Sequence, residues 1–87
     1  MNARDLIAWN MRRLRVDRGF SQERLALDSG VDRTYVSRLE RGIENPTVAV
    51  IEKLSTTLGV PIAQLFEEPA PDQPLPKPLR AGRKRKA

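Results

Sequence analysis

The sequence contains no cysteine and no histidine. Disulfides, thiol redox chemistry and ordinary zinc sites are therefore excluded, and so are catalytic pairs that depend on a histidine base. The carboxylates, among them Glu67 and Glu68 where the composition changes, do not form a pattern typical of acid–base catalysis. We expect no enzymatic activity, no bound metal and no cofactor.

Long apolar runs are also missing. No stretch approaches the ~20 apolar residues that span a bilayer, and the first residues do not resemble a signal peptide. We therefore expect a soluble, cytoplasmic protein that does not associate with a membrane. With 87 residues, the chain has room for one small domain, whose limited core would gain stability from a partner subunit.

The charge is modestly positive and unevenly distributed. The 16 Lys and Arg exceed the 11 Asp and Glu, which gives a net charge of +5 and makes polyanions the first class of partner to consider. Residues 1–66 have 10 basic and 8 acidic side chains (net +2), and residues 67–87 have 6 and 3 (net +3). DNA binding by the first segment must therefore depend on where its charges lie.

The first two thirds of the chain predict an all-α fold of short helices. Five helices are expected, around residues 6–14, 22–29, 32–41 and 48–58, with a short one from Pro61. The predicted N-caps are Ser21, Asp32 and Thr47, and glycines end the helices. Buried positions repeat at helical spacing; in the fourth helix they are Val48, Ile51, Leu54 and Leu58.

The composition changes after Glu68. Prolines at positions 69, 71, 74, 76 and 78 exclude a helix and favour an extended chain. Residues 80–87 contain five positive charges, which would strengthen any phosphate binding. We therefore divide the chain into a folded domain, residues 1–68, and a disordered proline-rich linker with a basic tail, residues 69–87.

Residues 32–41 form a helix with two chemically distinct faces. On a helical wheel, Val36 and Leu39 fall about 60° apart and face the core. The opposite face, an arc of roughly 140°, carries hydrogen-bond donors and no carboxylate; its members are Arg33, Thr34, Ser37, Arg38 and Arg41. Because a solvated surface helix normally mixes both signs of charge, we interpret this face as a binding surface.

The spacing of Gln22, Ala26, Gly30, Val36 and Leu39 resembles that of a helix-turn-helix, with a small residue where two helices cross and a glycine at the turn. The similarity extends from about residue 5 to residue 66, and it includes the segments GFSQ (19–22), LERG (39–42), NPT (45–47) and LGVP (58–61). The chain resembles the Cro/C1-type (XRE-family) repressor domain. The segment DRTYVS (32–37) is especially similar to controller proteins of restriction–modification systems.

The resemblance implies a DNA-binding transcriptional regulator, a repressor rather than an activator, that often controls its own gene. It would bind double-stranded DNA as a homodimer without a small-molecule ligand. The helix of residues 32–41 would enter the major groove, braced by the helix of residues 22–29. The two half-sites would lie about one helical turn apart in a partly palindromic operator.

The donors on the outer face can be sorted by the part of DNA that they suit. Arg33 and Arg38 can each make two hydrogen bonds to a guanine, while Thr34 and Ser37 can reach other base edges. Both arginines also have the simpler interpretation of solvated surface side chains.

Other residues are candidates for contacts with phosphate. By resemblance, Gln22 should hold a phosphate at the start of the bracing helix. Further phosphate candidates are Tyr35, Arg41 and Asn45. Tyr35 could instead pack beside the core.

The resemblance also assigns structural roles. Arg15 and Glu40 occupy positions that form a buried ion pair in family members. The last helix, with Ile62, Leu65 and Phe66, forms the dimer contact in many relatives, although the side chains of Leu65 and Phe66 could instead close the core. Trp9 departs from the usual family residue, and we expect it to be partly exposed or at an interface.

Three alternatives remain. The protein could be a restriction–modification controller, or an antitoxin whose tail binds a toxin. The tail has only Leu75 and Leu79 as apolar residues beyond alanine and proline, which weighs against an antitoxin. In a different class, the fold could be a protein-interaction module or coactivator that does not read DNA, but the arginine-rich face argues against this.

Overall fold

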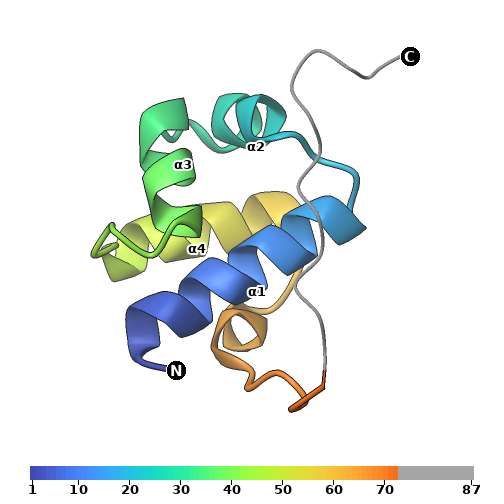
Figure 1. Cartoon of the computed structure of the whole chain (residues 1–87). Helices are drawn as coiled ribbons and strands as arrows, with labels where there is room; N and C mark the ends of the chain where they lie inside the picture. Colours follow the sequence, from blue (N-terminus) through green and yellow to red (C-terminus); the bar gives the residue numbers. More distant parts are fainter. Residues whose placement is uncertain (73–87) are drawn as a thin grey trace.

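The computed structural model describes residues 1–72; residues 73–87, which include most of the predicted linker and all of the basic tail, lie outside the described residues. Four α-helices follow one another (Figure 1): α1 (Ala3–Asp17), α2 (Gln22–Ser29), α3 (Arg33–Glu40) and α4 (Val48–Leu58). A five-residue 3-10 helix, η1 (Ile62–Phe66), comes last. Residues 1–72 contain no strand, so the all-α prediction is confirmed for this part of the chain.

The prediction of a fifth α-helix is wrong, because η1 is a short 3-10 element. The Gln64 N–H donates to the Pro61 carbonyl at 3.0 Å, which is the tighter i→i+3 pattern. Beyond Phe66 the backbone is extended, with φ −74° and ψ 134° at Glu67. Five residues between Pro61 and this extended segment leave little room for α-helical hydrogen bonds.

A side-chain cap precedes each of the α-helices. The predicted caps Ser21, Asp32 and Thr47 accept hydrogen bonds from backbone N–H groups two or three residues later, so these three predictions are confirmed. Asn2 caps α1 in the same way by accepting from the Asp5 N–H, which the sequence analysis did not predict. The caps satisfy donors that the first turn of a helix leaves unpaired.

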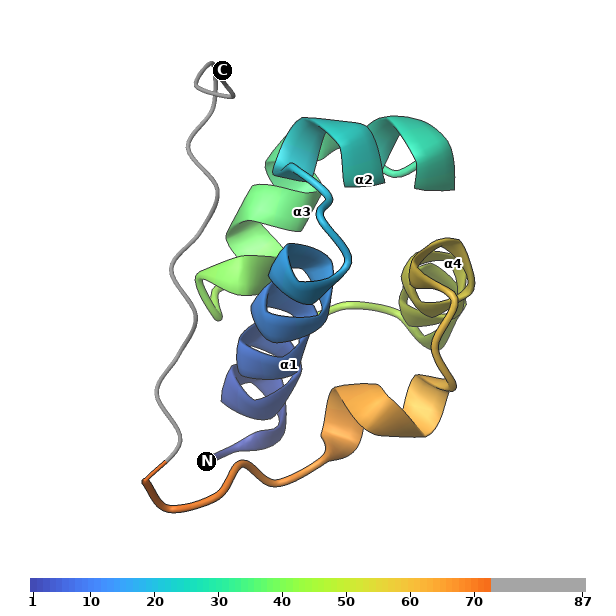
Figure 2. The same cartoon turned by 90° about the vertical axis from the view of Figure 1, so that its right-hand side faces the viewer.

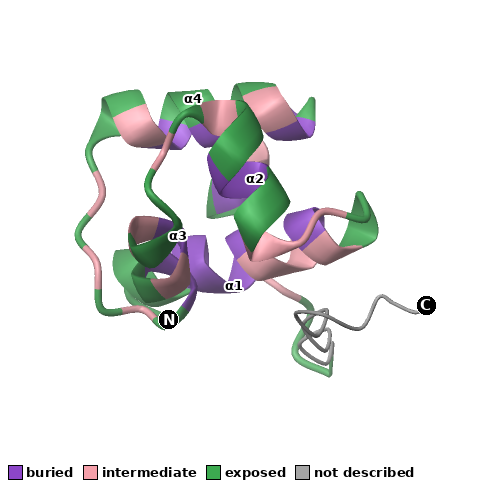
Figure 3. Cartoon of the chain, turned by 90° about the horizontal axis from the view of Figure 1, so that it is seen from above, coloured by how far each residue is buried: buried purple, intermediate pink, exposed green. Residues whose placement is uncertain are grey.

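The core lies where the helices meet. α1 packs against α3 and η1, while α2 packs against α3 and α4, and η1 lies below α1 and α4 (Figure 2). Figure 3 shows the buried parts of the helices facing one another around this centre. The core side chains are Ile7, Met11, Leu14, Leu25, Ala26, Val36, Leu39, Ile51, Leu54, Leu58, Val60 and Leu65. Within residues 1–72, no helix is both long and apolar enough to cross a bilayer.

The burial prediction for Val48 is wrong, and so is one of the two alternatives for Trp9. Val48, predicted to face the core, is 76% exposed; it is the first residue of α4, and burial in that helix begins only at Ile51. Trp9, predicted to be partly exposed or at an interface, is only 8% exposed, so the first of these alternatives is wrong and the second stays a prediction. The guanidinium carbon of Arg13 lies 5.4 Å from the centre of the Trp9 ring, so a cation covers part of the indole.

A buried amide joins η1 to the first helix. The side-chain nitrogen of Asn10, which is fully buried, donates to the carbonyls of Leu65 and Glu67 at 3.0 and 2.8 Å. It also lies 3.1 Å from the Leu6 carbonyl, and its oxygen accepts from Arg13 at 3.0 Å. Asn10 therefore ties the C-terminal end of the folded domain to α1.

Candidate nucleic-acid interface

The turn between α2 and α3 positions the predicted DNA-reading helix. Gly30 has a left-handed backbone, with φ +75°, and both its N–H and that of Val31 donate to the Ala26 carbonyl. The Asp32 carboxylate then accepts from the Thr34 N–H at 2.8 Å and starts α3. As a result α3 crosses α2 at a steep angle (Figure 1), with the small, buried Ala26 on the inner side of α2.

The two faces of α3 are as different as the sequence predicts. Val36 and Leu39 are 0% and 1% exposed and belong to the core. The outer face of α3, defined by Arg33, Thr34, Ser37, Arg38 and Arg41, points to solvent, and Ser37 is its only half-buried member. Arg33, Thr34 and Ser37 line one shallow recess. The structure thus brings together three of the four predicted base-reading residues, with Arg38 one helical turn beyond Thr34.

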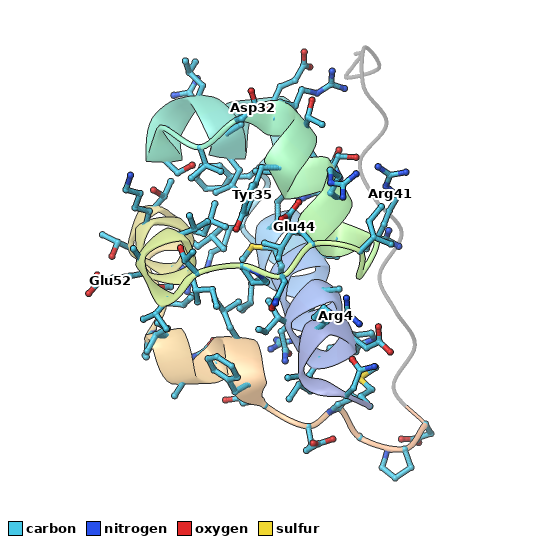
Figure 4. All side chains as sticks on the ribbon, turned by 90° about the vertical axis from the view of Figure 1, so that its left-hand side faces the viewer. Arg4, Asp32, Tyr35, Arg41, Glu44 and Glu52 are labelled. Atoms are coloured by element: carbon cyan, nitrogen blue, oxygen red, sulfur yellow. The ribbon has the colours of Figure 1, made fainter. Side chains whose placement is uncertain are left out.

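A carboxylate approaches this face from outside the helix, which the sequence analysis missed. The Nε of Arg38 donates to Glu44 at 3.0 Å, and its Nη2 lies 3.5 Å from the Ile43 carbonyl. Glu44 belongs to the loop between α3 and α4 (Figure 4). The outer face therefore carries an ion pair at Arg38, whereas no carboxylate within residues 1–72 forms an ion pair with Arg33 or Arg41.

The position of Glu44 follows from how α3 ends. Gly42 has φ +75°, its N–H donates to the Leu39 carbonyl, and the Ile43 N–H donates to the Arg38 carbonyl at 3.2 Å. This pair of bonds is a Schellman motif, which turns the chain back over the last helical turn. The one available signal in the sequence was the glycine two residues before Glu44.

The four predicted phosphate ligands lie in different settings. Arg41 and Asn45 are exposed, and Arg41 points away from the body of the domain (Figure 4). Tyr35 is half-buried and lies between α3 and α4 in the same view. Gln22 is also half-buried, and its side-chain nitrogen donates to Glu40 at 3.2 Å. In this conformation, the side chain of Gln22 is therefore engaged within the domain.

The predicted ion pair between Arg15 and Glu40 is present and fully buried. Nε and Nη2 of Arg15 donate to the two carboxylate oxygens at 2.6 and 2.9 Å, and both side chains are 0% exposed. Arg15 also donates to the Phe20 carbonyl at 2.8 Å, and Arg12 lies 3.8 Å from Glu40. The pair fixes α3 against α1, so its role at the interface is to hold the outer face in place.

The three residues predicted at a dimer contact differ in exposure. Ile62 and Phe66 are 38% and 44% exposed, whereas Leu65 is fully buried in the core. Leu65 therefore holds η1 in position, and of the three only Ile62 and Phe66 are exposed to solvent.

The chain is similar to known proteins over most of the folded domain. Residues 11–65 match the model of the family described as Helix-turn-helix. A hypothetical transcription factor of Neisseria meningitidis serogroup B is 48% identical over 66 residues, and the chain spans 62% of that protein's length. The match covers 76% of this chain. A crystal structure of the hypothetical transcription factor NHTF from Neisseria has a TM-score of 0.75, with 47% identity and 78% coverage of each chain.

Two restriction–modification controller proteins have similar structures. C.AhdI from Aeromonas hydrophila has a TM-score of 0.72 at 39% identity, and the match covers 76% of this chain and all of C.AhdI. C.Esp1396I bound to a 19 base pair DNA duplex has a TM-score of 0.70 at 30% identity, with 76% of this chain and 88% of that protein covered. Together with the helix arrangement described above, these similarities show that the chain belongs to the helix-turn-helix family, which is generally non-enzymatic.

Proposed function

We propose that the chain is a DNA-binding transcriptional regulator that places α3 in the major groove and reads bases with Arg33, Thr34, Ser37 and Arg38. The observation that carries the proposal is the outer face of α3, where these side chains reach solvent while the opposite face of the helix is held in the core. An α-helix fits the major groove of B-DNA, where arginine is the commonest reader of guanine.

Contacts to phosphate would fix the register of α3 in the groove. Arg41 and Asn45 follow the base-reading residues and are exposed, and the N–H groups at the start of α2 suit an anion. Tyr35 is the fourth candidate, through its hydroxyl group. The basic residues at positions 80–87 would add contacts that depend on charge and not on sequence.

The regulator would act as a homodimer on a partly palindromic operator in the cytoplasm. Ile62 and Phe66 leave apolar side chains open to solvent next to the buried Leu65, and such positions are favourable in a contact between subunits. A two-fold axis would present two copies of α3 to half-sites about one helical turn apart. Occupying a promoter in this way would repress transcription by excluding polymerase.

The first experiment is a titration of the protein against the DNA upstream of its own gene and against a scrambled duplex of the same length, at two salt concentrations. We expect binding to the upstream DNA at least about 10³-fold tighter than to the scrambled duplex, and a preference that survives added salt. Equal binding that collapses with salt would contradict sequence-specific reading of that DNA, and it would favour the protein-interaction alternative.

A second candidate function is control of a restriction–modification system. The observation that favours it is the 39% identity to C.AhdI, a match that covers the whole of that controller protein. The genes next to this one test it directly. A restriction endonuclease and a methyltransferase beside the gene would support the role, whereas their absence would leave a regulator of other genes.

A further inference from the structure

We propose that Glu44 determines the sequence specificity of this regulator by orienting Arg38. It would hold one edge of the guanidinium group so that the other edge faces the base. The inference rests on the proposed function, because it requires Arg38 to read DNA. It adds a residue outside α3 to the reading mechanism.

The contacts of Arg38 divide its guanidinium group into two edges. Nε donates to the Glu44 carboxylate at 3.0 Å, and Nη2 lies 3.5 Å from the Ile43 carbonyl. Nε and one hydrogen of Nη2 form the edge that faces Glu44, and Nη1 with the second hydrogen of Nη2 forms the other edge. Within residues 1–72, no hydrogen bond from Nη1 accompanies these contacts. Those remaining donors form a fork, which is the geometry that a bidentate contact with the O6 and N7 atoms of guanine requires.

The loop that supplies Glu44 is itself fixed to Arg38. The Ile43 N–H donates to the Arg38 backbone carbonyl. Arg38 therefore holds this loop through its backbone and donates to the Glu44 carboxylate through its side chain. The Glu44 side chain is 24% exposed, whereas that of Arg38 is 45% exposed. Glu44 is therefore the more buried of the two partners.

Stability alone does not account for this carboxylate. A partly exposed ion pair contributes little to folding, because solvent and salt screen it. A negative charge beside a DNA-reading face also weakens attraction to phosphate. Its advantage is that an arginine side chain held before binding loses less rotamer freedom when it meets a base.

The test compares single variants on two DNA probes: the duplex selected in vitro from a random-sequence pool by the unaltered protein, and a scrambled duplex. For Glu44→Ala we expect the ratio of the two affinities to fall about threefold, the size of a partly exposed ion pair. Binding to scrambled DNA should strengthen by about twofold, because one negative charge is lost near the phosphates. This opposite movement on the two probes is the signature of an orienting residue.

Two further variants separate orientation from charge. Glu52→Ala removes the same charge from an exposed position on α4, on the side that points away from α3 (Figure 4), and should leave the ratio unchanged. Glu44→Gln keeps an oxygen that can accept from Nε, so it should retain more of the ratio than Glu44→Ala. Circular dichroism of each variant checks that the fold is intact.

The decisive step repeats Glu44→Ala in an Arg38→Ala background, where it should no longer lower the ratio. An equal fall with and without Arg38, or a rise in the ratio of the Glu44→Ala variant, would overturn the inference. If Arg38→Ala lowers the ratio but Glu44→Ala does not, the inference fails and the proposed function stands. If Arg38→Ala leaves the ratio unchanged, the proposed role of Arg38 in reading bases fails as well.

Discussion

Two of the arginine–glutamate pairs of α3, Arg15 with Glu40 and Arg38 with Glu44, differ in almost every physical respect. Glu40 on its inner side binds Arg15 through two hydrogen bonds, and neither side chain is exposed. Arg38 on its outer side binds Glu44 through one bond of 3.0 Å, and both partners remain in contact with water. The same two residue types therefore hold the helix in the fold at one place and prepare a side chain for a ligand at the other.

The difference arises from desolvation. Two charges removed from water must satisfy each other, so the loss of either partner leaves an uncompensated buried charge. Two charges at the surface keep most of their hydration, and their attraction is weak. The inner pair therefore matters for stability and the outer pair for orientation, and substitutions should separate the two effects.

Glu40→Gln should have the largest effect. The substitution leaves the Arg15 cation buried with only the Phe20 carbonyl and a neutral amide as partners, and should lower the free energy of unfolding by about 3–5 kcal/mol. Urea unfolding followed by circular dichroism measures it, with Glu52→Gln on the exposed side of α4 as the matched control. A loss below about 1 kcal/mol would contradict the assigned role of the inner pair.

Arg38→Ala should have the second-largest effect, and it should weaken DNA binding rather than stability. We expect the free energy of binding to the selected operator to weaken by about 1–3 kcal/mol, with little change on scrambled DNA, because a bidentate contact with a base is lost. Fluorescence anisotropy with both duplexes measures this. An equal loss on the two duplexes would mean that Arg38 contacts phosphate.

Gly42→Ala tests the turn at the end of α3, which lies between Glu40 of the inner pair and Glu44 of the outer pair. At φ +75° an alanine is strained, and its Cβ would lie 2.9 Å from an oxygen of the flexible Asp5 side chain. We expect stability to fall by about 1–2 kcal/mol. The preference for operator DNA should also fall, because Glu44 is no longer held beside Arg38. Gly42→Asn is the control, since asparagine tolerates this conformation better; equal behaviour of the two variants would argue against backbone strain.

Arg24→Ala should have the smallest effect. Arg24 pairs with Asp28 four residues later at 2.8 Å, on an exposed surface of α2, and such pairs contribute about 0.3–0.5 kcal/mol. The free energy of unfolding and the ratio of operator to scrambled affinity should therefore stay close to those of the unaltered protein. A change in the operator-to-scrambled ratio as large as that of Arg38→Ala would show that α2 also reads bases.

Features set by neighbouring residues could be predicted from the sequence, since spacing and capping are local. The caps at Ser21, Asp32 and Thr47 and the two faces of α3 belong to this group. The pair between Arg15 and Glu40 joins residues 25 positions apart, and only the resemblance to a known family suggested it.

Features that depend on tertiary contacts could not be predicted from the sequence. Val48 has the spacing of a core position but is exposed, and Trp9 is buried with the guanidinium of Arg13 over part of its ring. Glu44 approaches Arg38 only because the chain reverses at Gly42. For the candidate site, the sequence therefore predicted the members of the outer face but not the contact that orients one of them.

The amide of Asn10 has a consequence for where the chain can be shortened. The residues that match the family model, 11–65, begin just after Asn10 and end just before Glu67, whose carbonyl that amide binds. A fragment trimmed to residues 11–65 would lack Asn10, and with it the amide that binds the Leu65 carbonyl. A fragment that includes Asn10 but ends before Glu67 would keep the amide and lose one of its acceptors. An unpaired buried polar group costs about 1–3 kcal/mol. A fragment that keeps this amide and both of its acceptors in η1 and beyond must therefore extend past residues 11–65 at both ends.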